Sequence, residues 1–510
     1  MKYRNKKTGL IIDNFAGGGG TSTGIEQAIG GPVDIAINHD EEAVRMHKVN
    51  HPDTLHYCES VYDIDPKIVT QGKLVDLCWL SPDCKHFSKA KGGRPVDKSI
   101  RGLAWVAIRW AATVKPRVIM LENVEEFRGW GPVMQNEKGD FIPDPEKKGS
   151  LFNSFVNILS NGVSKNDEGL AECMETLEIK PGTLLAQKIM NGLGYVVETK
   201  ELVACDYGAP TKRKRLFLIA RRDGQKIVWP TPTHGNPKLQ EVQNGELKPW
   251  RTASEVIDWT DLGNSIFNRK KPLADNTLRR IARGIKKFVI DNPNPFIINN
   301  SVAPTLMVNT TGHPGSSLSE PISTITTGNH HALISPILVQ MGYGDNEGKR
   351  QISLHNPLGT ITSGGNKFGL AATILVKNPE NQAKHVSAFL MKYYGSDTGQ
   401  SLDEPIHTIV GKDRFSLVTI KGENYCITDI QMRMLQSKEL YPAQGFPKNY
   451  IFDRDINGDY ITKKQQIAKC GNAVVPQLAK ALVEANLPDR CSGAKMSVQD
   501  SFPLRDLIPQ

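Results

Sequence analysis

The chain has 510 residues, of which 39% are hydrophobic and 23% are charged, a composition typical of globular domains rather than of disordered chain. A formal net charge of +9 favours a polyanionic partner such as nucleic acid, although many basic proteins have none. No apolar stretch approaches the roughly 18 residues of a membrane span, so we expect a cytoplasmic protein that makes no membrane contact. The eight cysteines form no Cys-x-x-Cys pair and no regular spacing, which argues against a disulfide framework and against a structural metal.

From about residue 10 to 222, short apolar runs alternate with helical patterns. This alternation predicts an α/β fold with a parallel sheet and helices on both of its faces. The loop from Phe15 to Gly20 then leads into a predicted helix over Thr23–Ala28, and its glycines allow the backbone to approach a ligand closely. The predicted strands are Gly9–Asn14, Val33–Asn38, Val75–Leu80, Val118–Glu122, Val196–Ala204 and Leu216–Ala220. Two further predicted helices are Leu103–Thr113 and Leu184–Leu193.

The composition changes after residue 222, where Pro, Asn, Gly, Thr and Ser become more frequent and periodic helical patterns become rare. A basic helical segment from Thr277 to Val289 is the exception, and it carries Arg279, Arg280 and Arg283. Within this region the pattern Pro-Φ-x-Thr-Ile, followed by Gly, occurs at 319–328, 355–364 and 403–411. We expect each copy to be a small β unit, separated by the strand-like runs Ile337–Met341, Ile374–Lys377 and Phe389–Tyr393. The copies are either packed hairpins or a repeated surface that fits an extended partner.

Helical patterning returns at residue 429, in Met432–Leu440 and Ile467–Asn486. Because the second segment has apolar residues at helical spacing, we expect it to pack back on the first domain. The predicted domains are therefore 1–224, an inserted 225–428, 429–487 as the end of the first domain, and a tail at 488–510.

Three predicted strand ends carry residues that are candidates for a role in catalysis. Cys84 follows an apolar strand that ends in Ser-Pro, at the sheet edge where α/β proteins bind ligands, and neighbouring lysines favour a thiolate. A buried structural cysteine is the alternative, and it describes Cys78 better. Glu122 ends another strand, although such a carboxylate more often caps a helix or pairs with a lysine. Arg213 and Arg215 alternate before a further strand, so they point to one face, which is usually a solvated one.

These residues, in their order along the chain, resemble the motifs of the DNA (cytosine-5) methyltransferase family. The similarity covers roughly 1–222 and 429–486. The matching strings are Asp13-Asn-Phe-Ala-Gly-Gly-Gly-Gly, Ser81-Pro-Asp-Cys-Lys-His-Phe-Ser, Glu122-Asn-Val, Tyr207-Gly-Ala-Pro-Thr-Lys-Arg-Lys-Arg, Glu439-Leu-Tyr-Pro-Ala-Gln-Gly-Phe-Pro and Cys470-Gly-Asn-Ala-Val-Val-Pro.

The resemblance implies a Rossmann-like methyltransferase sheet, S-adenosylmethionine as cofactor, and double-stranded DNA with a flipped-out cytosine as substrate. Cys84 would add to carbon 6 of the base, Glu122 would act at ring nitrogen 3, and Arg213 and Arg215 would bind O2 and orient Glu122. The mostly β insertion would be the target recognition domain. The implied cofactor residues are Phe15, Gly17, Gly19, Asp40, Ser60, Pro82, Asn472 and Val474, and the DNA contacts are Ser88, Arg279, Arg280 and Arg283.

The sequence departs from the family pattern in several places. One residue is inserted between Pro82 and Cys84, a form that resembles phage and prophage members, and Thr211 replaces a glutamine with little expected effect. Asp40 is chosen for the ribose because Asn38 occupies the usual register, and Ser60 or Asp63 is chosen for the adenine. An insertion over about 128–182 has no functional interpretation.

Three alternatives remain open at this stage. An amino-group methyltransferase would share the Ser-Pro-Asp loop but would need no cysteine. An RNA cytosine methyltransferase would share the fold, although it requires a smaller middle region. A catalytically inactive DNA-binding regulator would bind without turnover. We expect a monomer, and a cognate restriction endonuclease is an open question.

Overall fold

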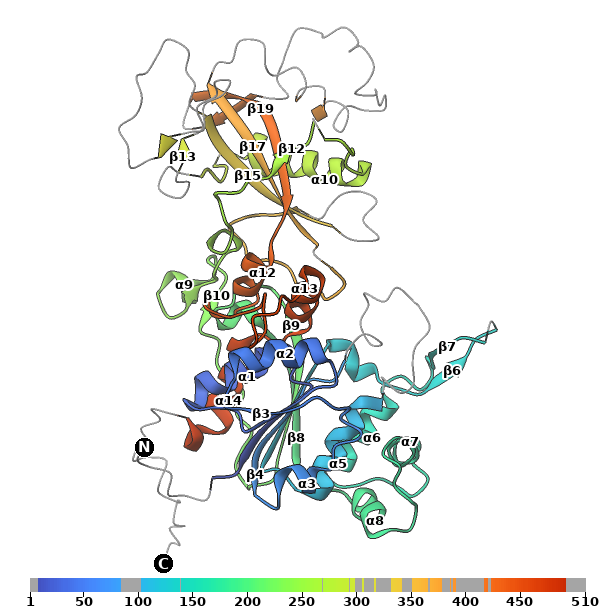
Figure 1. Cartoon of the computed structure of the whole chain (residues 1–510). Helices are drawn as coiled ribbons and strands as arrows, with labels where there is room; N and C mark the ends of the chain where they lie inside the picture. The colour runs from blue at the N-terminus through green and yellow to red at the C-terminus, as the bar shows by residue number, and fades with distance from the viewer. Residues whose placement is uncertain are drawn as a thin grey trace, which may run out of the picture. The chain divides into compact units, whose positions relative to one another are not determined.

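The computed structural model shows two compact units (Figure 1). The first comprises 1–209, 213–249 and 445–510, and the second comprises 210–212 and 250–444. The middle region is thus inserted into the first unit, but its borders lie later than the predicted 225 and 428. The structure describes residues 8–83, 102–137, 139–267, 269–292, 294–298, 305–306, 316–317, 332–341, 351–365, 367–377, 386, 389–390, 417–420 and 423–491.

A seven-stranded sheet in the order β3-β2-β1-β4-β5-β9-β8 forms the centre of the first unit. Five strands are parallel, whereas β9 is antiparallel to both β5 and β8. The predicted α/β sheet is confirmed, with this antiparallel edge as the difference. A ten-residue connection joins β8 to β9, which is shorter than a parallel crossover requires. The strands are β1 (Leu10–Asn14), β2 (Ile35–Ile37), β3 (Leu55–Tyr57), β4 (Val75–Leu80), β5 (Val118–Asn123), β8 (Val196–Val203) and β9 (Lys214–Arg221).

Alternate residues of the strands point to the two faces of the sheet, and each face is covered by helices. Cys78 and Leu80 of β4 join a core with α5 and α6, while Leu77 and Trp79 join a core with α1 and α14. This gives the predicted layered arrangement, visible in Figure 1. The helices of this unit are α1 (Gly20–Ile29), α2 (Glu41–Asn50), α3 (Pro66–Thr70), α5 (Val106–Thr113), α6 (Ser150–Leu159), α7 (Glu168–Thr176), α8 (Leu184–Asn191), α13 (Lys463–Asn472) and α14 (Pro476–Asn486).

The C-terminal helices return to the first unit, as predicted. The expected single segment Ile467–Asn486 is two helices, because Pro476 starts a new helix as its first residue. α1 and α14 approach at backbone distance: a Cβ on Gly24 would overlap the carbonyl oxygen of Pro476, and one on Gly20 would overlap that of Val474. Glycine at these two positions therefore allows α1 and the segment at the start of α14 to pack at backbone distance.

The insertion over about 128–182 belongs to the core of the first unit. It contains the hairpin of β6 (Val133–Gln135) and β7 (Phe141–Pro143), followed by α6 and α7. Phe155 of α6 packs on Trp105 and Trp130, all three fully buried. These aromatic contacts indicate that the segment stabilises the sheet face on which it packs.

The second unit is built on an antiparallel sheet in the order β12-β19-β17-β15-β16, with β18 paired to β19. Its core includes the apolar face of α10, with Ile281 and Ile285. The predicted runs at 337–341 and 374–377 lie largely in strands, whereas Phe389 and Leu390 are helical and buried rather than extended. The elements are β12 (Asn264–Ser265), α10 (Asp275–Ile285), β15 (Ala332–Gln340), β16 (Gln351–Ile352), β17 (Phe368–Lys377), β18 (Leu417–Ile420), β19 (Glu423–Met434) and α12 (Ser437–Ala443).

Of the three repeat copies, only 355–364 is described, and the copies at 319–328 and 403–411 lie outside the described residues. The described copy forms turns with Leu358 and Ile361 buried. Leu358 pairs with Thr211 through a β-bridge, and Thr211 is itself fully buried. Thr211 therefore has a packing role in the second unit that the sequence did not suggest.

The predicted helix Met432–Leu440 begins later, because β19 continues to Met434 and α12 starts at Ser437. A buried ion pair fixes this junction: both terminal nitrogens of Arg433 contact the carboxylate of Glu439 at 2.7 and 2.8 Å. Glu439 also accepts from the backbone of Asp258 and Gln436. These bonds explain why Glu439, the first residue of one of the matching strings, is buried.

Short elements complete the two units. In the described part of the chain no helix is long and apolar enough to cross a membrane. The remaining elements are η2 (Gly102–Trp105), η3 (Glu125–Gly129), η4 (Ala204–Tyr207), β10 (His234–Gly235), α9 (Gln240–Gln243), β11 (Lys248–Pro249), η5 (Ala253–Glu255), η6 (Lys286–Ile290), β13 (Thr305–Leu306), β14 (Ser316–Ser317) and η7 (Pro488–Arg490).

Replacing Gly24 with alanine tests the contact between α1 and α14. We expect Gly24→Ala to destabilise the protein by about 1–3 kcal/mol, because the added methyl group forces the two backbones apart. Chemical denaturation measures this change. Gly31→Ala is the matched control, because a Cβ at Gly31 meets open space. Equal stability of the two variants would contradict the close packing.

Candidate active site at the carboxyl edge of the sheet

The carboxyl ends of β1, β4 and β5 lie side by side, because these strands are parallel neighbours. Asn14 pairs with Leu80, and Leu80 pairs with Leu121. The segments that follow these strands, including the loop after Asn14 and the Ser81-Pro82 segment, therefore leave the sheet at one edge. This is the edge at which open α/β sheets bind ligands.

Glu122 and Arg215 form an ion pair at this edge. The Nε atom of Arg215 lies 3.0 Å from Oε1 of Glu122, and only 8% of the Glu122 side chain is exposed. The antiparallel register of β5 and β9 brings them together, since Glu122 lies opposite Phe217 and Asn123 opposite Leu216. Within the described part of the chain Oε1 accepts no hydrogen bond, so this buried oxygen retains capacity for a further partner.

Arg213 has different surroundings from Arg215, although both were predicted to point to one face. It is 2% exposed, and its Nη1 donates to the carbonyl oxygen of Gly471 at 3.0 Å. Gly471 lies in the C-terminal Gly-Asn-Ala-Val string. Arg213 thus ties β9 to that string, whereas Arg215 contacts the candidate acid.

Asn123 joins two strand ends. Its Nδ2 donates to the carbonyl oxygen of Pro82 at 3.3 Å, and its Oδ1 accepts from the backbone N–H of Val124 at 2.8 Å. The amide therefore holds the segment that leads toward position 84 against the end of β5. Cys84 and Ser88 themselves lie outside the described residues.

Cys78 is a structural thiol, as its strand position predicted. It is fully buried in β4, and burial raises the pKa of its thiol well above the usual range. The nearby Asp13 adds to this effect. A thiol with a raised pKa is a poor nucleophile, so Cys78 is not a competing candidate.

The loop between β1 and α1 has the backbone conformation expected of a ligand cradle. Phe15, Gly17 and Gly19 all have left-handed φ values, of 60°, 54° and 88°. Phe15 is the one non-glycine residue among them, and such strain is concentrated at functional sites. The loop ends at the N-terminus of α1, where N–H groups favour an anionic group such as a carboxylate. These features fit the amino-acid end of S-adenosylmethionine.

The other predicted cofactor residues have mixed environments. Asp40 caps α2 by accepting from the Ala43 N–H at 3.1 Å, and it also pairs with Lys469. Burial, the largest single effect, would raise the pKa of Asp40, but the contact with Lys469, the hydrogen bond from Ala43 and the charge of His39 together lower it. Ser60 accepts from the N–H of Tyr62 at 3.3 Å.

The C-terminal string supplies two further candidates. Asn472 is exposed at the end of α13, and Val474 is buried. Both belong to the first unit, as do Phe15 and Pro82.

The arginines of α10 are not equivalent. Arg279 is exposed and pairs with Asp275 at 2.7 Å, and Arg283 is partly exposed. Arg280 is 5% exposed, with its Nη1 4.0 Å from the sulfur of Met341. A buried guanidinium cannot reach a DNA phosphate without rearrangement, so Arg279 and Arg283 are the better placed of the three.

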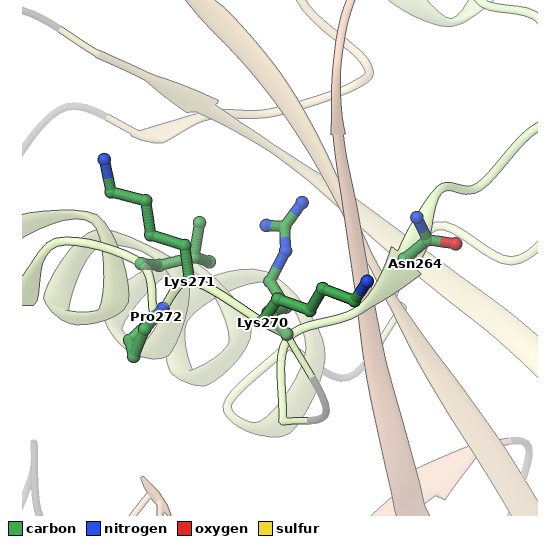
Figure 2. Close-up of a pocket in the computed structure, with 6 residues that line it drawn as sticks. Asn264, Lys270, Lys271 and Pro272 are labelled. Atoms are coloured by element: carbon green, nitrogen blue, oxygen red, sulfur yellow. The ribbon is translucent and has the colours of Figure 1, made fainter.

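A basic pocket of about 530 Å³ lies just before α10, and sequence reasoning missed it. Figure 2 shows Lys270 and Lys271 on the segment that leads into the helix, with Asn264 across from them. Arg269 lines the same pocket. Within the described residues none of these three cations forms an ion pair, in contrast to Arg279. The three consecutive basic residues in the sequence were the available signal.

The described residues contain no cluster of His, Cys, Asp or Glu suited to a metal ion.

A hydrogen-bonded chain of mostly buried polar side chains lies beneath the loop between β1 and α1, and the sequence analysis missed it. Its members are Asp13, Ser22, His47 and His56. Its signal was the spacing of three histidines at 47, 51 and 56.

The model of the family described as "C-5 cytosine-specific DNA methylase" matches residues 10–131 and 184–487. The chain belongs to this family. The match includes the predicted motifs and leaves out most of the insertion at about 128–182. Family membership confirms the resemblance found in the sequence.

Relatives of the chain include type II methyltransferases. M.AgeI of Thalassovita gelatinovora is 28% identical over 45% of this chain and 44% of its own length. M.AquIA of Picosynechococcus is 24% identical over 48% of this chain and 87% of its own length. The match thus spans less than half of the first relative. Among solved structures, a mutant of Spodoptera frugiperda DNMT2 is 13% identical, covers 94% of this chain and 100% of its own, and has a TM-score of 0.45.

Removing the Arg213 side chain tests its role in packing. We expect Arg213→Ala to cost about 1–3 kcal/mol of stability, because a buried hydrogen bond to Gly471 is lost. Lys214→Ala is the control on the same strand: Lys214 is 44% exposed and pairs with Glu201, so its loss should cost less than about 1 kcal/mol. Denaturant unfolding compares the two, and a larger loss for Lys214→Ala would contradict this assignment.

Proposed function

We propose that this protein methylates carbon 5 of cytosine in a specific sequence of double-stranded DNA, using S-adenosylmethionine. The observation that carries the proposal is the buried Glu122–Arg215 pair at the carboxyl edge of the sheet. Asn123 anchors the segment leading to Cys84 at the same edge. Family membership and the relatives' type II methyltransferase names support the choice of reaction.

In the proposed reaction the thiolate of Cys84 forms a bond to carbon 6 of the cytosine. The electron pair displaced from the 5,6 double bond makes carbon 5 nucleophilic. Bound S-adenosylmethionine supplies the methyl group that carbon 5 acquires. A base then removes the carbon 5 proton, and the electrons of that bond expel the Cys84 thiolate and restore the ring.

Glu122 would stabilise the adduct by hydrogen bonding or proton donation at ring nitrogen 3. Its Oε1 lies 3.0 Å from Nε of Arg215 but accepts no hydrogen bond from the described residues, so this oxygen keeps acceptor capacity for the base. Arg215 would hold the carboxyl group in place and contact O2 of the base, because a guanidinium offers several donors in a fixed plane. Arg213 would support this arrangement through Gly471.

The cofactor would lie over the loop that contains Phe15, Gly17 and Gly19. Asn472 and Val474 of the C-terminal string and Pro82 would complete its surroundings. Asp40 and Ser60 remain the proposed ribose and adenine contacts, and a contact from Asp40 would compete with its pairing to Lys469.

The second unit would act as the target recognition domain, because carbon 6 is accessible only after the base leaves the stack. Arg279, Arg283 and the basic pocket offer cations for phosphates, and Ser88 remains a proposed contact from the sequence. Arg280 would contact DNA only after its buried side chain had rearranged. We further propose that the enzyme serves a restriction-modification system or a phage genome in the cytoplasm. A cognate endonuclease would then share its target sequence.

Replacing the candidate nucleophile tests the reaction. We expect Cys84→Ser to abolish carbon 5 methylation, and Glu122→Gln to lower its rate by about 10²–10⁴-fold. Bisulfite sequencing of DNA from cells that express each variant measures methylation and reveals the target. Cys491→Ser is the control, because Cys491 is a partly exposed free cysteine that lies after the last matching motif. Full methylation by Cys84→Ser would exclude this mechanism and favour an amino-group methyltransferase.

Removing the cations of the basic pocket tests DNA binding. The logarithm of the DNA association constant falls linearly with the logarithm of the salt concentration. If Lys270 and Lys271 each contact a phosphate, the Lys270→Ala/Lys271→Ala double variant should make this slope shallower by about 2. Fluorescence anisotropy with a duplex measures this slope. Lys286→Ala is the control, since Lys286 already pairs with Asp291 at 2.9 Å. An unchanged slope in the double variant would remove the pocket from the DNA interface.

A further inference from the structure

A chain of hydrogen-bonded side chains runs beneath the cradle loop. The hydroxyl of Ser22 donates to Oδ2 of Asp13 at 2.8 Å, and Nε2 of His47 lies 3.0 Å from the same hydroxyl oxygen. Nδ1 of His47 lies 2.8 Å from Nε2 of His56. The four groups come from β1, α1, α2 and β3, so folding of the first unit assembles them.

Only the far end of this chain reaches the surface. Asp13 and Ser22 are fully buried and His47 is 1% exposed, whereas His56 is partly exposed. Oδ1 of Asp13 is buried and accepts no hydrogen bond within the described residues. A carboxylate held in this way is costly, so protonation is its alternative state.

The geometry allows a balanced proton transfer along the chain. With Asp13 ionised, Ser22 donates to it, His47 donates from Nε2 to Ser22, and His56 donates from Nε2 to Nδ1 of His47. When Nδ1 of His56 takes up a proton from solvent, each donor passes its own proton one place inward. Asp13 becomes neutral, and both histidines end in the opposite tautomer without carrying a charge.

We propose that Ser22, His47 and His56 are positioning residues that connect Asp13 to solvent protons and thereby couple the charge of Asp13 to binding at the cofactor loop. This inference rests on the proposed function, because it takes S-adenosylmethionine as the ligand. Asp13 lies two residues before Phe15, and Ser22 lies three residues after Gly19. A change of charge at Asp13 thus occurs at the base of the loop.

The surroundings favour titration of Asp13 itself near neutral pH. Burial raises the pKa of Asp13 to about 7, partly offset by the hydrogen bonds from Ser22, and Glu26 of α1 raises it further. Burial lowers the pKa of His47 well below its usual range, and His51 and His56 add to this effect. Burial, with Lys48, lowers the pKa of His56 to about 4. The histidines of the chain are therefore neutral at pH 7.

The other titratable groups near the chain are engaged or neutral. His51 pairs with Glu26 at 2.8 Å. The Cys78 thiol of β4 has a strongly raised pKa, and burial raises the pKa of the Tyr450 hydroxyl well above its usual range. The Cys78 and Tyr450 groups therefore cannot replace Asp13 as the titrating group between pH 6 and 8.

The sign of the coupling follows from the ligand charges. Both ligands carry one ammonium and one carboxylate group, whose opposite charges offset each other, and only S-adenosylmethionine carries a sulfonium cation. Ionised Asp13 favours the cation, so affinity for S-adenosylmethionine should rise with pH, by at most about tenfold per pH unit. The affinity should level off above about pH 7. Affinity for S-adenosylhomocysteine should change much less.

Isothermal titration calorimetry of the full chain with each ligand, between pH 6 and 8, tests the proposal. In buffers of different ionisation enthalpy, S-adenosylmethionine should release protons near pH 7. Asp13→Asn should remove both the pH dependence and the proton release. Ser22→Ala should move the midpoint to higher pH, because a hydrogen bond that favours ionised Asp13 is lost.

Ser154→Ala is the matched control, because it removes another buried serine hydroxyl that donates to an aspartate, Asp167, at 3.0 Å. Its pH profile should equal that of the wild type. If the wild type binds S-adenosylmethionine without pH dependence or proton release, the inference is wrong while the proposed function stands. If the wild type binds neither ligand at any pH, the proposed function itself is contradicted. Should Ser22→Ala not fold, Asp13→Asn decides alone.

Discussion

The antiparallel pairing of β5 with β9 is the constraint on which the candidate active site depends. Glu122 lies at the end of β5, and Arg215 lies on β9 at the position just beyond the partner of Asn123. Because this register fixes both backbones, the guanidinium lies within ion-pair distance of a buried carboxylate. A shift of one residue would turn Arg215 to the other face of the sheet. The chemistry proposed for Glu122 therefore rests on strand pairing.

The remaining contacts of the site join segments that are far apart in the chain. Arg213 bonds to Gly471, Lys469 pairs with Asp40, and α1 touches α14 at its glycines. Each contact links an N-terminal element to the segment after residue 445. The first unit is therefore built from segments that lie before and after its insertion.

Periodicity and strand-end chemistry predicted much of the fold. β4 was predicted to the residue, and the other five strands predicted in the first unit overlap observed strands, because buried strands are short apolar runs with clear ends. The short strand β3 was not predicted. The edge pairing of β8 was not predictable from pattern, since it depends on the length of a turn. Met432 was assigned to a helix because apolar spacing does not distinguish a strand end from a helix start, and the Arg433–Glu439 pair decides that boundary.

The candidate site was predictable where a string matches a family motif, as for Glu122, whereas its position at a strand end alone favoured a helix cap or a pairing with lysine. It was less so where tertiary contacts decide the role of a residue. Arg213 and Arg215 were indistinguishable in sequence, yet one is buried against Gly471 and the other contacts Glu122. The chain from Asp13 to His56 was missed because its members lie on four separate elements. Only the spacing of the histidines signals it, and that spacing alone does not identify a partner.

The central claim is that the sulfur of Cys84 bonds to carbon 6 of an extruded cytosine. The most direct measurement is to incubate the protein with S-adenosylmethionine and a duplex that carries 5-fluorocytosine at its target, and then to map any adduct by mass spectrometry. Fluorine cannot leave as a proton does, so the account predicts a stable covalent complex at Cys84. Methylation of the unmodified duplex without any trapped adduct, or an adduct at another cysteine, would contradict it.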